Sequence, residues 1–189
     1  MTSRATAPSR GPGARVRSAT IADARAIAEI RVASWRATYR GIVPTSILEG
    51  MDVDRDEVRF RGRLANPGLM AFVAEDVTGS VIGFVMAGAA RDDDAAGLGE
   101  VYAIYLAPGA RGRGVGRALM DAALEALEAS GFSTAILWVL TANEPARRFY
   151  ERAGFQLDGT ARDLDFDGTP VEEIRYRRAD SGRARTIVA

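Results

Sequence analysis

Residues 100–116 read EVYAIYLAPGARGRGVG and join three kinds of local sequence. An apolar run of strand character, residues 101–106, ends at Pro108 and Gly109. Glycines then alternate with arginines, and a strongly helical segment begins at Arg117. The first N–H groups of a helix lack intrahelical partners and carry partial positive charge, so a glycine-lined turn ahead of them can bind phosphate through the main chain. The stretch predicts an anion site for a phosphate-bearing cofactor.

Two common phosphate-binding loops do not match this turn. A Walker loop requires Gly-Lys-Ser/Thr, and the chain contains no lysine. A dinucleotide fingerprint requires glycine at its sixth position, but after Gly112 and Gly114 that position is Arg117, and Gly116 comes one residue early. The hairpins expected around the turn also argue against repeated βαβ units.

Three missing residue types limit the chemistry. Cysteine and histidine are absent, and all 25 basic residues are arginine. This excludes disulfides, a thiol nucleophile, thiolate metal sites, the usual imidazole base and a Schiff-base lysine, and we expect no metal. An acid or base must be Asp, Glu, Tyr, a terminus or water. The missing lysine is best explained by genomic base composition.

Length and charge predict one globular domain with three parts. We expect a disordered leader over residues 1–15, a single domain over residues 16–177 and a loose tail over residues 178–189. No apolar segment is typical of a signal peptide or a membrane span, which predicts a cytoplasmic protein without a membrane partner. The formal net charge is zero, so nothing favours nucleic acid as a partner.

The remaining elements are expected to flank the central strand. Helices are predicted from Thr20, over residues 45–49 and 54–64, and from Asn143 to about Ala153. Two hairpins are predicted, one over residues 70–87 and one over residues 155–177, and the second turns at an Asp-Gly pair. Residues 92–94 are three aspartates, expected to form a solvated loop; attraction of a cationic substrate is the alternative. The pattern predicts an α/β fold of the α+β type, with a mixed, mostly antiparallel central sheet flanked by helices.

Two motifs in this order resemble the GNAT superfamily of N-acetyltransferases. RGRGVG, residues 111–116, is similar to its Arg/Gln-x-x-Gly-x-Gly/Ala motif, and NEPARRFYERAGF, residues 143–155, resembles its later helix that ends Phe-Tyr-x-x-x-Gly-Phe. WRATYRGIVP, residues 35–44, is similar to one bacterial subgroup. The resemblance runs from Val16 to Arg177 and implies the GNAT acyl-CoA N-acyltransferase fold.

The resemblance implies that the cofactor is acetyl-CoA. Its pyrophosphate would bind backbone N–H groups of the turn, with help from arginine side chains, its pantetheine arm would pair with main-chain groups of the central strand, and an asparagine would touch it or simply cap the helix. The implied cofactor-binding residues are Ile104, Leu106, Arg111, Gly112, Arg113, Gly114, Val115, Gly116, Arg117 and Asn143.

Two residues are candidates for proton transfer. Because there is no cysteine, an amine is expected to attack the thioester directly. The family often places a carboxylate at the position of Glu100, which would act as base; pairing with an arginine is the alternative. The pKa of Glu is about 6 units below that of an alkylammonium, so burial of Glu100 or a water relay would be needed. Tyr150 matches the family tyrosine that protonates the leaving thiolate; a core tyrosine is the alternative.

The acceptor is expected to be a small-molecule amine bound near Trp35 and Tyr39. The alternative for these two aromatic residues is that they belong to the core. A protein N-terminus or lysine side chain is the second choice for the acceptor. A non-catalytic CoA-binding regulatory module is the rival from another class. Sheet edges and the C-terminal segment leave room for a homodimer.

Overall fold

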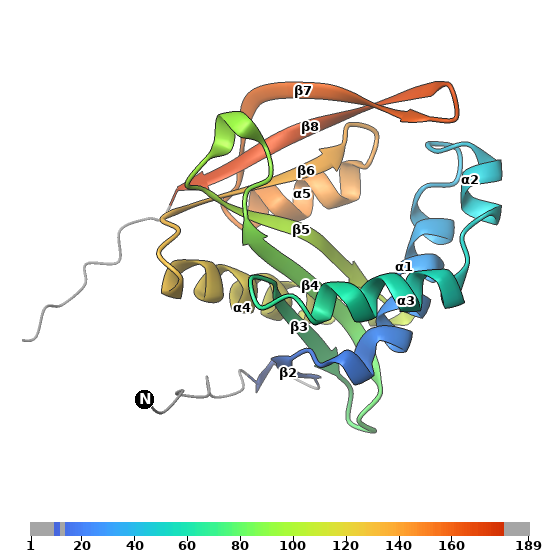
Figure 1. Ribbon diagram of the computed structural model, residues 1–189, viewed down its shortest axis with the longest axis vertical. Coiled ribbons are helices and arrows are strands. Elements are labelled where there is room, and N and C mark those ends of the chain that lie inside the picture. The colour runs from blue at the N-terminus through green and yellow to red at the C-terminus, as the bar shows by residue number, and fades with distance from the viewer. Residues whose placement is uncertain (1–9, 12–13, 180–189) are drawn as a thin grey trace, which may run out of the picture.

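The computed structural model describes residues 10–11 and 14–179. Its strands form one eight-stranded sheet in the order β1-β2-β3-β4-β5-β6-β8-β7 (Figure 1). All neighbouring strands are antiparallel except β5 and β6, which are parallel. The predicted mixed, mostly antiparallel sheet is therefore confirmed.

The first half of the chain builds one side of the sheet and the helices that cover it. The elements are β1 (Arg10–Gly11), β2 (Ala14–Ser18), α1 (Ala24–Thr38), α2 (Thr45–Glu49), α3 (Val53–Leu64), β3 (Met70–Glu75) and β4 (Val81–Ala89), with a short 3-10 turn η1 (Ile21–Asp23) before α1. Thr20 and Asp23 form the reciprocal capping contacts that their spacing predicts. Strand β1 pairs with β2 at Arg10↔Arg15, inside the segment predicted as a disordered leader.

The second half begins with η2 (Asp93–Ala95) and β5 (Gly99–Leu106), followed by η3 (Pro108–Ala110) and α4 (Val115–Ala129). Then come β6 (Thr134–Leu140), α5 (Glu144–Arg152), β7 (Gln156–Phe166) and β8 (Thr169–Ala179). Helix α4 starts two residues before Arg117, because Gly114 already has the left-handed conformation that precedes the helix. The last hairpin is longer than predicted at its turn, and β8 extends past Arg177 to Ala179. The rest of the expected leader and tail, residues 1–9, 12–13 and 180–189, lies outside the described residues.

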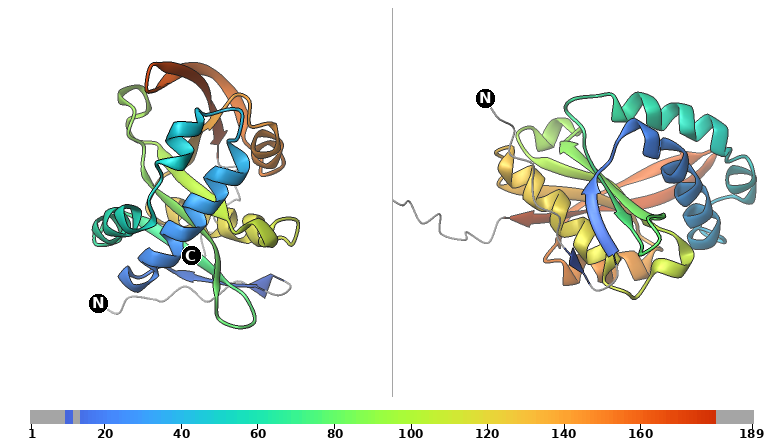
Figure 2. Two further views of the ribbon diagram at one scale, coloured as in Figure 1. Left: turned by 90° about the vertical axis from the view of Figure 1, so that its right-hand side faces the viewer. Right: turned by 90° about the horizontal axis from the view of Figure 1, so that it is seen from below.

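Helices cover both faces of the sheet. Side chains of α1 and α3 pack on β3 and β4 in one apolar core, whereas α4 packs on the opposite face together with Phe149 and Tyr150 of α5. Figure 2 shows this three-layer arrangement. A smaller third core joins the end of α1 and α2 to the turn of the β7–β8 hairpin. That turn, Asp167-Gly168, has positive φ at both residues, as an Asp-Gly hairpin turn requires.

The parallel pair β5–β6 is short, and this positions the site. Only Gly99↔Ala135 and Glu100↔Ile136 are paired, after which the two strands separate. On its other edge β5 pairs with β4 along its length, with one irregularity at Met86/Ala87. Within the described ranges, no helix is long and apolar enough to cross a membrane.

Candidate active site

The edge of β5 that faces β6 is open from residue 101 to residue 106, and we call it the open edge. The Ala107 N–H donates to Ile82 O at 2.9 Å, so Ala107 points toward β4. Peptide groups alternate in direction along a strand, and therefore those of Ile104 and Leu106 point toward the open edge. The carbonyl of Leu106 already accepts a hydrogen bond from Ser34 Oγ at 2.6 Å. The N–H and C=O of Ile104 and the N–H of Leu106 therefore point to the open edge, where an extended ligand can form hydrogen bonds with them.

The open edge leads directly into the glycine turn. Gly112 and Gly114 have φ values of 75° and 78°, a conformation that favours glycine, and a Cβ atom on either would meet nothing within 4 Å. Gly116 serves a different purpose, because a Cβ there would lie 3.4 Å from Leu106 Cδ1 and 3.5 Å from Phe149 Cε2. The first-turn N–H groups of α4, which start at Val115, lack intrahelical partners and face this turn. The backbone of the turn can therefore hold an anion.

The three arginines of the motif differ in their contacts. Arg111 donates to Thr38 Oγ1 at 2.8 Å, and Arg117 forms an ion pair with Asp121 at 2.8 Å. Arg113 makes no ion pair or side-chain hydrogen bond within the part of the chain that the structure describes. Of the three, it is the cation most available to a bound phosphate.

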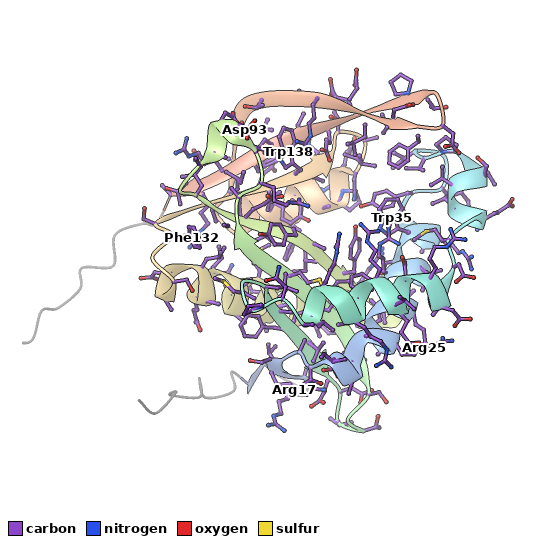
Figure 3. The ribbon with its side chains drawn as sticks, viewed as in Figure 1. Arg17, Arg25, Trp35, Asp93, Phe132 and Trp138 are labelled. Atoms are coloured by element: carbon purple, nitrogen blue, oxygen red, sulfur yellow. The ribbon has the colours of Figure 1, made fainter. Side chains whose placement is uncertain are left out.

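Four aromatic residues gather where β5 and β6 separate, and we call Trp35, Tyr39, Tyr105 and Tyr150 the aromatic cluster. Trp35, labelled in Figure 3, donates its indole N–H to Tyr105 Oη at 2.9 Å and packs edge-to-face on Tyr39 at 4.8 Å between ring centroids. The hydroxyl of Tyr39 interacts with Tyr105 and with Asn143. Burial raises the pKa of both Tyr39 and Tyr105, so both phenols are neutral at physiological pH.

Tyr150 approaches this cluster from the other face of the sheet. Its ring packs against Phe149 at 5.4 Å and Phe155 at 6.3 Å. Burial raises the pKa of Tyr150, and the neighbouring Tyr105 raises it further. The Tyr150 hydroxyl has no hydrogen-bond partner among the described residues. It is therefore a protonated phenol whose hydrogen-bonding capacity is not used by the protein.

Asn143 caps helix α5, as one of its two predicted roles requires, and its contact with the cofactor stays a prediction. Its Oδ1 accepts from the Ala146 N–H at 3.3 Å and caps α5. The same buried side chain interacts with Tyr39. The cap therefore anchors α5, which carries Tyr150, beside the aromatic cluster.

Glu100 lies apart from the other predicted site residues. Its buried carboxylate accepts hydrogen bonds from the backbone N–H of Arg91 at 3.1 Å, from Arg91 Nε at 3.1 Å and from Arg91 Nη2. Tyr105 comes five positions after Glu100 along an extended strand, a distance of about 16 Å at roughly 3.3 Å per residue. The structure thus brings Trp35, Tyr39, Tyr150 and Asn143 together and leaves Glu100 in the arginine pair that was its alternative; its role as base stays a prediction.

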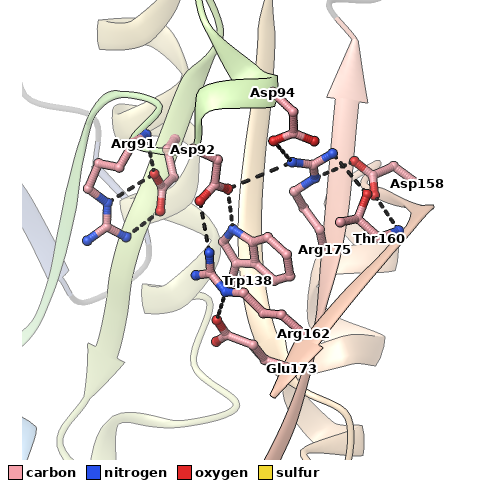
Figure 4. A network of polar contacts seen from close by, with 10 residues as sticks. Arg91, Asp92, Asp94, Trp138, Asp158, Thr160, Arg162, Glu173 and Arg175 are labelled. Atoms are coloured by element: carbon pink, nitrogen blue, oxygen red, sulfur yellow. Dashed lines mark hydrogen bonds and ion pairs between the residues drawn. The ribbon is translucent and has the colours of Figure 1, made fainter. Parts of the chain in front are cut away.

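The aspartates at positions 92–94 form neither a free acidic patch nor a simple solvated loop. Asp92 accepts from Trp138 Nε1 at 2.7 Å and pairs with Arg162 at 2.9 Å, while Asp94 pairs with Arg175 at 2.8 Å. Figure 4 shows how these contacts join the β4–β5 connection to β7 and β8 across Trp138. The two charges are neutralised locally, so only Asp93 remains for a cationic substrate.

Sequence reasoning missed Tyr105, the residue that connects the aromatic cluster. It lies in an apolar run, which by itself predicts only a strand. The alternation of faces along that strand places Tyr105 opposite Ile104 and Leu106, on the side of α1. That period-2 pattern was the available signal, but the partner Trp35 lies 70 residues away in sequence.

Comparisons with known proteins agree with this geometry. The model of the acetyltransferase (GNAT) family matches residues 27–155. The chain is 33% identical over 174 residues to the uncharacterized N-acetyltransferase YuaI of Bacillus subtilis, covering 92% of this chain and 97% of that protein. It is also 38% identical over 111 residues to the mycothiol acetyltransferase of Propionibacterium freudenreichii, but these residues are 59% of this chain and only 33% of that enzyme.

Solved structures share the fold. A phosphinothricin acetyltransferase from Sinorhizobium meliloti, in complex with AcCoA, has a TM-score of 0.69 and 29% identity, with 90% of each chain covered. A PaiA N-acetyltransferase from Thermoplasma acidophilum, in complex with coenzyme A, has a TM-score of 0.64 and 21% identity, covering 88% of this chain and 98% of the other. The predicted GNAT fold, N-acetyl transfer as the reaction class and acetyl-CoA as cosubstrate are confirmed at the level of the family. The chain belongs to the GNAT family of N-acetyltransferases.

Proposed function

We propose that this enzyme moves the acetyl group of acetyl-CoA directly to a primary amine of a small molecule. The observation that carries the proposal is the continuous track from the open edge of β5 to the N-terminus of α4. The peptide groups of Ile104 and Leu106 would pair with the pantetheine amides, and the turn from Arg111 to Arg117 would bind the pyrophosphate. Arg113, free of protein partners among the described residues, would add a charge-assisted contact to a phosphate.

The chain's residues support direct transfer. A covalent acetyl-thiol intermediate is excluded because the chain has no cysteine. The amine nitrogen would attack the thioester carbonyl, and N–H groups on the open edge would stabilise the oxyanion. Tyr150 would then donate its proton to the departing sulfur. Its raised pKa keeps that proton in place until charge develops, and a thiolate in the same buried surroundings also becomes a stronger base than in water.

Glu100 would act as base only through a chain of water molecules. Both carboxylate oxygens are already occupied by Arg91, and the residue lies at the opposite end of β5 from the glycine turn. The ion pair also fixes the β4–β5 connection. We therefore place less weight on Glu100 as base than on Tyr150 as the acid that protonates the departing sulfur.

A small-molecule acceptor fits the relatives. Mycothiol acetyltransferases and a phosphinothricin acetyltransferase are, by their names, enzymes that modify small molecules. In this chain Trp35 and Tyr39 would contact the acceptor from α1, next to Phe166 at the turn of the last hairpin. A protein N-terminus or lysine remains the second candidate, and a cytoplasmic homodimer stays a prediction.

The proposal is tested by release of free CoA from acetyl-CoA with a panel of primary amines. Wild type should turn over at least one amine, whereas Tyr150→Phe should bind acetyl-CoA equally well and lose about 10²-fold or more in kcat. Tyr102→Phe is the matched control, because it removes a strand hydroxyl that donates to Ala89 O away from the cluster. CoA binding without turnover on any amine would favour the non-catalytic module, and failure to bind CoA would refute the proposal.

A further inference from the structure

The last peptide group of β5 is held by a side chain of α1 instead of a neighbouring strand. Strand β6 has left β5 after Glu100, so no strand pairs with the carbonyl of Leu106 at the open edge. Ser34 Oγ donates to this carbonyl at 2.6 Å. The N–H of the same peptide group, which belongs to Ala107, donates to Ile82 O at 2.9 Å. The peptide group between Leu106 and Ala107 is therefore fixed at both its oxygen and its nitrogen.

Ser34 is an unusual residue for its place in the helix. Its side chain is buried, at 1% relative exposure, and alanine is the better helix former at such a position. A serine inside a helix commonly turns its hydroxyl back to the carbonyl one turn earlier or outward to water. Here the hydroxyl bonds instead to a strand 72 residues further along the chain. A buried hydroxyl is costly without such a partner, so its contact with Leu106 accounts for its presence.

The glycine turn that follows β5 is held by separate contacts. The Ala110 N–H donates to Ala107 O at 2.9 Å, which closes the short 3-10 turn η3. Arg111 Nη2 donates to Thr38 Oγ1 at 2.8 Å, and Thr38 lies one helical turn after Ser34 on α1. The hydrogen bond of Ser34 therefore acts on the end of the strand, whereas the turn has its own attachments.

We infer that Ser34 is a positioning residue, which aligns the open edge of β5 with the pantetheine arm. This inference rests on the proposed function. The N–H of Leu106 belongs to the preceding peptide group, which shares the Leu106 Cα atom with the group that Ser34 holds. Fixing one peptide group limits rotation of the other, so the Leu106 N–H keeps its direction toward the open edge. Donors that are oriented in advance need no rearrangement when the ligand binds.

The test compares Ser34→Ala with wild type by calorimetric titration of two probes. CoA carries the pantetheine arm, and ADP carries the pyrophosphate without it. We expect the variant to bind CoA about fivefold more weakly, the effect of about one hydrogen bond, and to bind ADP with an unchanged Kd. With an amine that wild type accepts, kcat should fall by about tenfold, because a misplacement of about 1 Å can cost about 10²-fold.

Ile27→Val is the matched control on the same helix. Ile27 is fully buried in the core under α1 and touches neither the open edge nor the glycine turn. Loss of one methylene there loosens α1 to a similar extent, so both variants should melt lower than wild type by roughly 1–4 °C. The control should nevertheless match wild type in its Kd for CoA, its Kd for ADP and its kcat.

A purely structural role predicts a different result. If Ser34 only attaches α1 to the sheet, the two variants will behave alike in all three measurements, and the inference is overturned. An equal loss of affinity for CoA and ADP would also overturn it, since the defect would then lie in the glycine turn. A wild type that acetylates no amine refutes the proposed function instead, and the affinities for CoA and ADP still decide the role of Ser34.

Discussion

Replacing Gly83 with alanine should destabilise the protein and weaken CoA binding together. Gly83 lies on β4 opposite Leu106, and a Cβ atom there would sit 2.5 Å from Leu106 Cδ2, 3.1 Å from Leu119 Cδ1 and 3.1 Å from Tyr105 O. The backbone oxygen cannot move aside without shifting β5. The added methyl group therefore displaces the two leucines between the sheet and α4, at the inner end of the glycine turn.

The size of the effect follows from two opposing contributions. Overpacking of a core typically costs about 1–3 kcal/mol. Alanine regains about 0.5–1 kcal/mol because glycine loses more conformational freedom on folding. The net loss in the free energy of unfolding is about 1–2 kcal/mol, which lowers the melting temperature by roughly 2–8 °C for a chain of this length.

Gly88→Ala is the matched control on the same strand. The Cβ atom there would lie 2.5 Å from the hydroxyl of Tyr102, the far end of a half-buried side chain that can turn away. Loss of the Tyr102 hydrogen bond to Ala89 costs about 1 kcal/mol, and the alanine gain offsets most of it.

Differential scanning calorimetry and CoA titration of both variants measure the difference. We expect Gly83→Ala to melt lower and to have the larger Kd for CoA, with Gly88→Ala close to wild type in both. Equal melting temperatures for all three proteins would refute the reasoning from close packing. A destabilised Gly83→Ala with unchanged CoA affinity would refute the link between Leu106 and the cofactor track.

Two further predictions concern single charges. Arg113→Ala should weaken CoA binding by about tenfold and reduce the salt dependence of that binding, whereas Arg117→Ala should change the Kd little because Arg117 is already paired with Asp121. Calorimetric titration of CoA at two salt concentrations checks this prediction, and equal changes in Kd for the two variants would contradict it. The hydrogen bonds from Arg17 lower the pKa of Asp23 to about 2, so the native state favours the carboxylate form of Asp23. Above pH 4 this preference adds about 2 kcal/mol to the free energy of unfolding, and the contribution is lost as the pH falls toward 2. The stability gap between wild type and Asp23→Asn in urea should accordingly close over that range, and a gap independent of pH would contradict the assignment.

Local sequence patterns predicted most of the fold. The Asp167-Gly168 turn, the Asn143 cap and the Thr20–Asp23 capping contacts are encoded within a few residues, and each is present. The lengths of β7 and β8 were underestimated because charged residues fill most positions of this hairpin, so that no clear apolar alternation marks its ends.

The site was predictable where the backbone builds it and not where distant side chains meet. The glycine turn follows from a short motif, so its residues could be named in advance. The bond between Trp35 and Tyr105 joins positions 70 residues apart, and the pair of Asp92 with Arg162 joins positions equally distant. Such contacts depend on the order of strands in the sheet, which the spacing of residues along the chain does not specify.

Besides the backbone pairing of β8 with β6, the last hairpin makes two kinds of side-chain contact with the rest of the protein. Near β6, Arg162 and Arg175 bind Asp92 and Asp94 and cover the Trp138 ring at 3.9 Å and 5.5 Å. At the turn, Phe166 packs on Trp35 within an apolar cluster. Salt screens the ion pairs of Arg162 and Arg175 and strengthens the apolar contact of Phe166 with Trp35. Cooling weakens the apolar contact and has little effect on the ion pairs. The ionic composition and the temperature of the solution therefore act separately on these two sets of contacts of the hairpin.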